Sequence, residues 1–557
     1  MDRFRPFVLA LLPLSWLLSN HYYPWTTAWQ EGLALGAVLV AALFLSAPPR
    51  LPFHPWTAAI LTLVGISVLL QWGSGIISFS GDALMVLLYL MTFAAALILG
   101  KSVRATSKDR FGLDLFLVSV ALAGAVGVVI AVAQWWQVAL PGIHMADLRP
   151  GHRPYGNLAQ ANHFSSASFL ALCATGALWQ RHRLPFWPAL CLLAWFALGI
   201  AMSGSRTGIL QLAMTFVLLL TTPAHVLPSR KRLQIAFFLA IVIGVYLLWR
   251  WHSSIQVRAI ATGGGVDVRW PLWHLMFDAI LRGPYLGYGW QQISSAQAVT
   301  ALDHRPLQRH FESAHNLVLD LLLWMGPLLG ALLIGFLVKL LLDASRASRS
   351  GDRGARWLWC GVLGLLVHSM VEAPLTFAYF LLPFGVLLGA LDPDLVEIRK
   401  GGPLRLVRLA VGATAFAFAC VVLEYLAIEE ATRIFRFEAA RIGTMEKVEA
   451  PKLRLLTQQD ALLKFYRTEA RAGMPPALLD QMRIVAVRFA YPPVMLRYAL
   501  AAGLNGKPDE AAETLRRLCA MHHPERCQEA RDAWLAAQTK FPVLLLVQPP
   551  SVPNRVY

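Results

Sequence analysis

Over roughly the first 430 residues, long apolar runs alternate with short polar loops. The hydrocarbon core of a bilayer takes about 20 apolar residues of helix, and most of these runs approach that length. The pattern predicts an all-α, polytopic membrane helix bundle with about 13 transmembrane helices. The expected spans cover roughly 7–20, 27–46, 55–72, 81–99, 111–139, 163–180, 185–201, 207–222, 234–250, 315–341, 356–372, 374–391 and 406–427.

Composition supports the membrane prediction. The 557 residues are 57% hydrophobic and 15% charged, against about 25% charged residues in a soluble globular protein. The first run is followed by the bulky segment "HYYPWTT" instead of a small-residue cleavage site, so we expect it to be retained as a span. The net charge of +17 is concentrated in short loops and forms no basic stripe with interleaved aromatics, so no nucleic acid partner is expected.

The positions of the basic loops predict the orientation of the chain. If the N-terminus is cytoplasmic, the cytoplasmic loops include the basic stretches at 101–110, 180–183, 229–232, 345–356 and 399–408. The opposite loops at 21–26, 73–80 and 373 carry no Lys or Arg. This asymmetry follows the positive-inside rule, and because thirteen spans is an odd number, it predicts that the C-terminal tail lies on the side opposite the cytoplasm.

The tail differs in composition from the rest of the chain. We expect residues 1–427 to form a transmembrane core with a long periplasmic loop at 251–314, and residues 428–557 to form a small periplasmic helical domain. The segment "GKPDEAAETLRRL" has a tetratricopeptide-like pattern, so the domain either binds a partner protein or simply caps the bundle. In an oxidising periplasm Cys519 and Cys527 could form a disulfide, provided that the backbone between them is not helical.

Several arginines lie on the predicted periplasmic side, where topology disfavours them. They include Arg153, Arg206 and Arg269. The guanidinium fork matches phosphate oxygens, so a phosphate or diphosphate ligand is the natural partner. The alternatives are a snorkelling Arg206 and an Arg269 that pairs with Asp267 or Asp278.

A histidine opens one of the late apolar runs. Ser313 can cap the helix start and would place His315 in the first turn, where the helix dipole disfavours imidazolium and keeps the ring neutral, as a general base requires. An interfacial histidine without a catalytic role is the alternative.

Three further groups of polar residues accompany the outer ends of spans. Gln160 belongs to the polar segment "RPYGNLAQANHF" at 153–164, which either faces a sugar or phosphate or is an ordinary solvated loop. His368 and Glu372 are four residues apart near the end of one span, and Tyr379 begins the next. A simple helix-to-helix hydrogen bond is the alternative explanation for the last group.

Together these segments resemble the O-antigen ligase superfamily with its Wzy-C type core. The resemblance rests on "SGSRTG" (203–208), "DVRWPLW" (267–273), "GYGW" (287–290) and "AHNLVLDLLLWMG" (314–326). The segment 153–164 and the outside tail are similar to those of bacterial protein O-oligosaccharyltransferases, which glycosylate pilins and other periplasmic proteins.

The resemblance implies a metal-independent glycosyl transfer at the periplasmic face, without a cofactor. The donor would be an oligosaccharide linked to undecaprenyl diphosphate, and the acceptor a pilin-like periplasmic protein. Arg206 and Arg269 would bind the diphosphate, and His315 would be the general base. Gln160, Arg153 and Tyr379 would contact substrate.

Alternative functions remain open at this stage. The same core motifs suit an O-antigen ligase acting on lipid A–core, or a Wzy-type polymerase. No Walker loop, dinucleotide fingerprint or zinc-ligand spacing is present, which disfavours nucleotide-driven transport and metalloprotease chemistry. A transporter of lipid-linked glycan or a non-catalytic scaffold is a further alternative, although no pair of short, interrupted helices marks inverted repeats.

Overall fold

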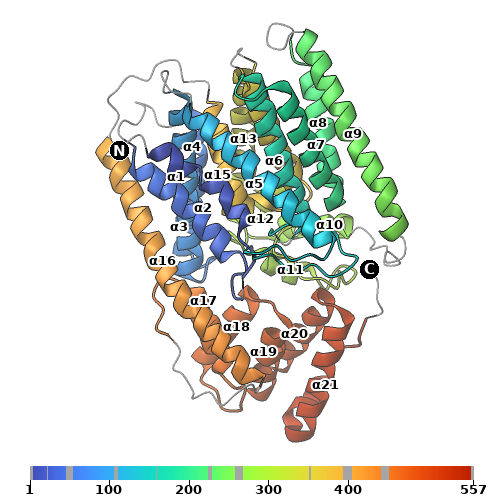
Figure 1. Ribbon diagram of the computed structural model, residues 1–557. Helices are drawn as coiled ribbons and strands as arrows, with labels where there is room; N and C mark the ends of the chain where they lie inside the picture. Colours follow the sequence, from blue (N-terminus) through green and yellow to red (C-terminus); the bar gives the residue numbers. More distant parts are fainter. Residues whose placement is uncertain are drawn as a thin grey trace. The chain divides into compact units, whose positions relative to one another are not determined.

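In the computed structural model, the chain is helical throughout its described part (Figure 1). The structure describes residues 4–21, 23–45, 54–105, 111–142, 144–158, 160–223, 229–257, 268–349, 353–392, 404–440 and 451–553. Within these ranges there are α-helices and short 3-10 helices and no strands, in agreement with the predicted all-α class.

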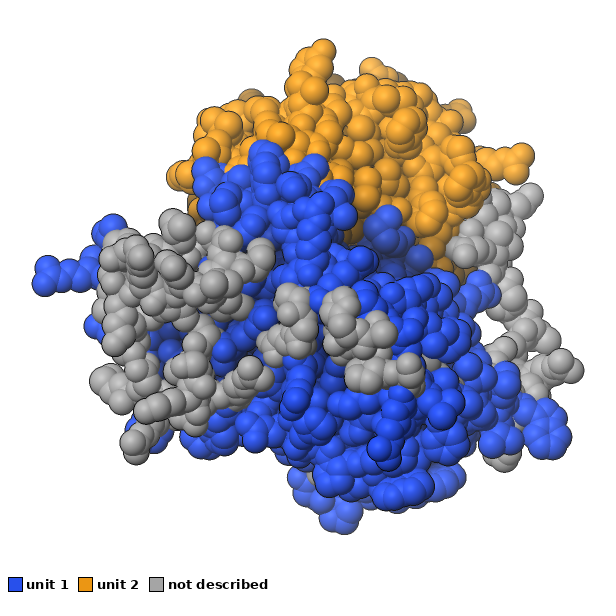
Figure 2. Space-filling model, turned by 90° about the horizontal axis from the view of Figure 1, so that it is seen from above, with its two compact units in different colours: residues 1–62, 88–264, 335–422 blue, residues 63–87, 265–334, 423–557 orange. Residues whose placement is uncertain are grey.

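The chain forms two compact units, which Figure 2 colours separately. Unit 1 comprises residues 1–62, 88–264 and 335–422, and unit 2 comprises residues 63–87, 265–334 and 423–557. Unit 2 therefore contains the predicted tail together with two earlier stretches of the chain. The helices that pass from one unit into the other are α3 (Pro55–Gly73), α4 (Ser80–Ala105), α13 (Pro327–Ala347) and α16 (Leu404–Ala439).

Unit 1 is built around helix α6 (Ala161–Gln180), in which every residue except Asn162 is buried. Its small residues allow close packing, as is typical of helices in membranes; at Gly176, for example, an added Cβ would collide with the ring of Trp357. The other helices of the unit are α1 (Arg5–Leu9), η1 (Leu12–Leu17), α2 (Ala28–Leu43), α5 (Phe111–Trp135), α7 (Phe186–Ser203), α8 (Arg206–Leu220), α9 (Ser229–Val257), α14 (Ala355–Ser369), η2 (Pro374–Thr376) and α15 (Ala378–Ala390).

Unit 2 joins the start of α4 to the tail through a buried ion pair. The Arg488 guanidinium donates from Nε to one oxygen of Asp82 at 2.8 Å and from a terminal nitrogen to the other at 2.9 Å. The unit also contains α10 (Arg269–Arg282), α11 (Ile293–Thr300) and α12 (Leu317–Met325), followed by the tail helices α17 (Thr457–Arg467), α18 (Pro476–Arg488), α19 (Pro492–Leu504), α20 (Pro508–Met521), α21 (Pro524–Lys540) and η4 (Pro542–Leu546).

The tail contains the disulfide that its cysteine spacing allowed. Cys519 and Cys527 are bonded, with their Cα atoms 4.7 Å apart. The backbone between them is not one continuous helix, because α20 ends at Met521 and α21 begins at Pro524. The reversal between the two helices brings the cysteines together, so the predicted pairing is confirmed. The tetratricopeptide-like character of the tail stays a prediction.

Seven of the described helices are long and apolar enough to cross a membrane. They are α3, α4, α5, α7, α9, α13 and α16. Shorter apolar helices lie at 5–17, 28–43, 206–220 and 378–390. Thus the membrane-bundle class agrees with the structure, and the total of about thirteen spans stays a prediction.

One predicted span, 315–341, is two helices in the structure. Helix α12 ends at Met325 and α13 begins at Pro327, with Gly326 between them at φ +80°. An added Cβ on Gly326 would collide with the carbonyl oxygen of Tyr285, so glycine is required by both the backbone conformation and the close approach. The side-chain nitrogen of Gln71 also donates to the carbonyl oxygens of Leu286 (2.7 Å) and Trp324 (2.6 Å) and holds these segments together.

Helix α16 is longer than the predicted span at 406–427, because it continues to Ala439. Its 36 residues correspond to roughly 54 Å at 1.5 Å per residue, whereas a bilayer core is about 30 Å thick. The polar residues after 427, which marked the start of the tail in the sequence, therefore extend the same helix.

Candidate active site

His315 lies in the loop that precedes helix α12, with a positive φ of 51°. The residue that caps this helix is Asn316, whose side-chain oxygen accepts hydrogen bonds from the backbone N–H groups of Val318 (3.0 Å) and Leu319 (3.3 Å). The prediction that Ser313 caps the helix and places His315 in its first turn is wrong. Asn316 is as good a capping residue as serine. The helix therefore begins at Leu317, three residues later than a cap at Ser313 would place its start.

Ser313 instead binds Asp320, a buried acid on α12. Its hydroxyl donates to Asp320 Oδ2 at 2.7 Å and accepts the backbone N–H of His315 at 2.9 Å. The other oxygen, Asp320 Oδ1, accepts the backbone N–H of Ala314 at 2.7 Å. A carboxylate that is 2% exposed thus fixes the backbone on the N-terminal side of His315.

Helix α10 lies against the same loop. Trp273 donates its indole N–H to the carbonyl oxygen of Ala314 at 3.0 Å. Arg269 is the first residue of α10, one turn before Trp273, and its side chain is half-buried. The structure therefore brings the helix that begins at Arg269 next to the residue that precedes His315.

Of the two acids that could pair with Arg269, Asp278 already binds other side chains. Asp278 Oδ1 accepts Arg282 Nε at 2.8 Å, and Asp278 Oδ2 lies 3.0 Å from His304 Nε2, so both of its oxygens already bind other side chains. The other candidate, Asp267, lies outside the described residues. The diphosphate-binding role of Arg269 stays a prediction.

In unit 1 the structure brings Arg153 and Arg206 together. Gly204 has φ +58°, and the Arg153 side chain lies over it, with a terminal guanidinium nitrogen 3.4 Å from the Gly204 carbonyl oxygen. Burial lowers the pKa of Arg153; Glu372 raises it and Arg206 lowers it, so all three charges lie close together. Arg206 itself begins α8 and is exposed. An anion that met this site would encounter two guanidinium groups from different loops.

Glu372 lies just beyond the end of α14, three residues after Ser369. Its carboxylate accepts the side-chain N–H of Asn162 at 3.1 Å, which ties it to the start of α6. His368, one turn earlier, forms a hydrogen bond between its Nδ1 and the Ser166 hydroxyl at 2.8 Å. The polar pair noticed at the end of the predicted span 356–372 therefore contacts α6 at two successive turns.

Gln160 is the residue immediately before α6, and its carbonyl oxygen accepts the backbone N–H of Phe164 at 3.0 Å. One turn into the helix, His163 Nδ1 is 2.9 Å from the hydroxyl of Tyr379. Tyr379 is 1% exposed. In this geometry Tyr379 orients His163, and direct contact of Tyr379 or Gln160 with substrate stays a prediction.

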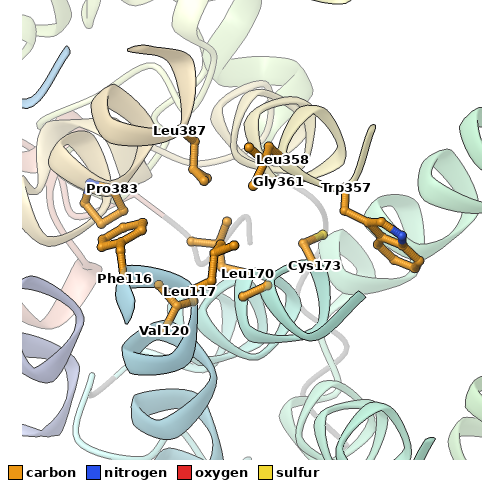
Figure 3. A pocket seen from close by; sticks show the side chains of 11 residues that line it. Phe116, Leu117, Val120, Leu170, Cys173, Trp357, Leu358, Gly361, Pro383 and Leu387 are labelled. Atoms are coloured by element: carbon orange, nitrogen blue, oxygen red, sulfur yellow. The ribbon is translucent and has the colours of Figure 1, made fainter. Parts of the chain in front are cut away.

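A small cavity in unit 1 contributes nothing to this chemistry. It lies between α5, α6, α14 and α15, and Figure 3 shows an apolar lining that includes Phe116, Leu170, Cys173, Trp357 and Leu387. Its free volume of about 10 Å³ holds no more than one water-sized sphere. Within the described residues, no three His, Cys, Asp or Glu side chains gather closely enough to hold a metal ion.

Two family models match the chain. Residues 189–334 match the O-antigen ligase family, and residues 356–537 match the family described as virulence factor membrane-bound polymerase, C-terminal. The general O-oligosaccharyltransferase of Acinetobacter baylyi is 29% identical over 540 residues, which cover 92% of this chain and 91% of the relative. The chain resembles O-antigen ligase-type protein O-oligosaccharyltransferases. It is an integral membrane glycosyltransferase of the O-oligosaccharyltransferase or O-antigen ligase type.

A second relative is similar over a shorter stretch. The ComP-specific O-oligosaccharyltransferase of Acinetobacter baylyi is 32% identical over 129 residues, or 23% of each chain. The O-antigen ligase family match contains Arg206, Arg269 and His315, and the polymerase family match contains Tyr379.

One buried acid, Glu31, received no role from the sequence. Glu31 on α2 is 2% exposed, accepts the Tyr89 hydroxyl at 2.8 Å and also accepts the backbone N–H of Ala378 at 2.6 Å. The bond to Ala378 fixes the residue that precedes Tyr379. A carboxylate inside the apolar run 27–46 was the available signal, because such groups in a membrane helix need a partner or a function.

Proposed function

We propose that this protein transfers a preassembled glycan from undecaprenyl diphosphate to a Ser or Thr hydroxyl of a periplasmic protein, such as a pilin. The observation that carries the proposal is the similarity to a general O-oligosaccharyltransferase along 92% of the chain. The relative is named for oligosaccharide transfer, and the similarity includes the core and the tail alike.

In the proposed reaction His315 is the general base. Its imidazole takes the proton of the acceptor hydroxyl while the oxygen attacks the anomeric carbon. The bond between that carbon and the diphosphate oxygen breaks, and undecaprenyl diphosphate leaves with the electron pair. One displacement without a covalent enzyme intermediate gives inversion at the anomeric carbon. The anchored loop formed by Ser313, Asp320 and Asn316 supports this role, because a base must be held within hydrogen-bonding reach of its proton.

Arg206 and Arg269 bind the diphosphate in this proposal. Fixed guanidinium groups stabilise the charge that develops on the leaving group, and no metal ion is required. Arg153, which lies over Gly204 beside Arg206, adds a second positive charge at that site. Gln160 and Tyr379 complete the proposed substrate contacts, with Tyr379 also orienting His163.

The tail supports a protein acceptor. It carries an open groove with a free volume of about 300 Å³ between α17, α18 and the loop before α4. Its lining combines apolar and polar side chains, a combination that suits the side chains of an extended polypeptide. Its lining comprises Ser78, Phe79, Thr457, Asp460, Ala461, Lys464, Phe465, Thr468, Leu478, Gln481, Met482, Ile484 and Val485.

We further propose an inner-membrane location with the N-terminus in the cytoplasm and the active site and tail in the periplasm. The distribution of Lys and Arg between loops supports this orientation. The disulfide in the tail is consistent with an oxidising compartment. A reporter enzyme fused after residue 540 that requires export should be active, and cytoplasmic activity at that position would contradict the orientation.

Two other acceptors are alternatives within the same family. The match of residues 356–537 to a membrane-bound polymerase family favours a second lipid-linked glycan as acceptor, and the ligase match favours lipid A–core. The test is purified full-length chain with lipid-linked oligosaccharide and either pilin, rough lipopolysaccharide or no further acceptor. A gel shift of pilin alone supports the proposal, whereas a shift only in lipopolysaccharide, or polymer formation without acceptor, rejects it.

A further inference from the structure

The loop that carries His315 rests on the disulfide-bonded turn of the tail, and both belong to unit 2. The backbone N–H of Gln308 donates to the carbonyl oxygen of Ala520 at 3.1 Å. The ring of His310 stacks on the ring of His522, with centroids 5.6 Å apart and an angle of 18° between the planes. Two residues of the loop therefore contact the tail, one at the last turn of α20 and one in the turn that follows it.

The turn is itself rigidly held. His522 is 7% exposed, and its Nε2 lies 2.7 Å from the carbonyl oxygen of Ala490, so that this nitrogen carries the proton and donates it. The Cys519–Cys527 disulfide encloses the turn, and both cysteines pack in a buried cluster that also includes Ala301 at the end of α11. The surface under the His315 loop is thus fixed by a covalent bond, a buried hydrogen bond and apolar packing.

Contacts continue from this surface to His315. Gln297 on α11 donates to the carbonyl oxygen of Arg309 at 2.8 Å and accepts the backbone N–H of Phe311 at 2.9 Å, so it holds the loop on both sides of His310. The ring of Phe311 then meets the ring of His315 edge to face, with centroids 5.7 Å apart. Within the segment 308–315, no residue is more than two positions away from a residue that makes one of these contacts.

We infer that the tail positions the general base, with His522 as the positioning residue and the Cys519–Cys527 turn as its support. This inference rests on the proposed role of His315. His315 is attached to α12 through Asn316 on its C-terminal side and through the bonds of Asp320 to Ser313 and Ala314 on its N-terminal side. Farther upstream, the loop rests on the tail through Gln308 and His310, and Phe311 connects this part to the His315 ring. Loss of the tail contact leaves the attachments to α12 and removes the support under residues 308–311.

The expected consequence is a loss of rate without loss of donor binding. A general base works only within about 3 Å of the oxygen whose proton it removes, and displacement of a catalytic group by about 1 Å can cost roughly 100-fold in rate. His522→Ala removes both the stacked ring and the bond to Ala490, and should lower glycan transfer about 10- to 100-fold per folded molecule. His522→Gln retains a planar amide with an N–H donor near the position of Nε2, and should restore most of the activity.

The neighbouring residue provides a matched control. His523 is partly exposed at the start of α21, where its Nδ1 accepts the Glu525 N–H at 3.5 Å, and it makes no contact with the loop at 308–315 among the described interactions. His523→Ala should transfer glycan at the wild-type rate. A Cys519→Ser/Cys527→Ser protein should resemble His522→Ala, because the turn loses its covalent closure.

The deciding experiment combines these changes with His315→Asn in the full-length chain. Transfer to the acceptor is measured per folded molecule, and binding of lipid-linked oligosaccharide is measured in parallel. If His522 acts through His315, His522→Ala has no further effect on the residual transfer of His315→Asn, because the two changes remove one function. An equal fold-loss in both backgrounds, or unchanged transfer by His522→Ala alone, would overturn the inference. Near-normal transfer by His315→Asn would instead reject the proposed function, whatever His522→Ala does.

Discussion

Asp320 accepts a hydrogen bond from the Ser313 hydroxyl at 2.7 Å, and this buried pair fixes the loop before His315. The second Asp320 oxygen accepts the backbone N–H of Ala314 at 2.7 Å. Because an amide replaces one acceptor oxygen by a donor, Asp320→Asn cannot accept the Ser313 proton and the Ala314 N–H in the present geometry, and the Ser313 hydroxyl must turn and give up its donor bond. We expect about a tenfold loss of glycan transfer and roughly 1–3 kcal/mol of lost stability, with lipid-linked donor still bound.

The matched control for this change is Asp303→Asn. Asp303 is about half exposed and pairs with Arg282 at 2.8 Å on the surface of the same unit. Exposed ion pairs contribute roughly 0–1 kcal/mol, so transfer and stability should remain near wild type. Equal behaviour of the two variants would show that the Asp320 bonds have no role in transfer.

His315→Asn should remove the proposed base without straining the loop. His315 has φ 51°, a conformation that asparagine adopts more readily than alanine. Transfer should fall by roughly 10²–10⁴-fold, the usual contribution of a positioned general base, while folding and donor binding persist. His304→Ala, on the same loop but bound to Asp278 at 3.0 Å, is the control and should remain active.

Arg269→Lys should lower transfer about tenfold or more, because lysine keeps the charge but lacks the two-pronged donor set of a guanidinium. Arg282→Lys is the matched change on the same helix, at a residue already paired with Asp278 and Asp303. It should have little effect. Near-normal transfer by both Arg206→Ala and Arg269→Ala would remove the diphosphate clamp from the mechanism.

The Cys519–Cys527 disulfide determines how many cysteine thiols can be alkylated before and after reduction. In the unreduced, denatured protein, alkylation should label four cysteines, namely Cys173, Cys191, Cys360 and Cys420, and reduction should add Cys519 and Cys527. Loss of the bond should destabilise the tail by roughly 2–3 kcal/mol, because it closes a short loop in the unfolded chain. Six labelled thiols before reduction would contradict the bridge.

Acid should weaken the tail through the stacked histidines. The pKa of His522 is lowered to about 4, chiefly by burial; the bond to Ala490 opposes the shift, and the nearby charge of His310 contributes to it. Burial also lowers the pKa of His310 to about 4, and Arg488 adds to the effect. The unfolded histidines titrate near 6.5 and bind more protons between these values, so stability falls as the pH drops from about 6.5 to about 4.

The measurement is the thermal unfolding midpoint of the full-length chain from neutral to mildly acidic pH. Each histidine contributes at most about 1.4 kcal/mol per pH unit, so the wild-type midpoint should fall more steeply than that of His522→Gln. Parallel pH dependence in the two proteins would show that folding does not lower the pKa of His522.

Periodicity and run length predicted the helices well. The apolar run at 111–139 and the "AHNLVLDLLLWMG" run at 314–326 both contain helices, because burying a continuous apolar stretch requires backbone hydrogen bonds within the stretch itself. The sequence also suggested the Cys519–Cys527 bond, and the reversal between α20 and α21 determined that it could form.

Local sequence was a poor guide where two polar residues could serve the same backbone group. Ser313 and Asn316 are both good helix caps, and the sequence gives no means of choosing between them. The choice depends on Asp320, which is seven residues beyond Ser313 and binds its hydroxyl. The break at Gly326 likewise depends on the approach of the segment around Tyr285, 41 residues earlier by number in the chain.

The sequence by itself determined that this chain is a helical membrane protein, because the lengths and polarities of its runs are local properties that solvent and bilayer act on directly. It also identified Arg206, Arg269 and His315 as candidates through short motifs. Only the tertiary structure decided which polar groups meet, such as His163 with Tyr379, Glu31 with Tyr89, and His310 with His522. Each of these pairs joins residues far apart in the chain, and a buried polar group finds its partner only when the helices that carry the two residues pack together.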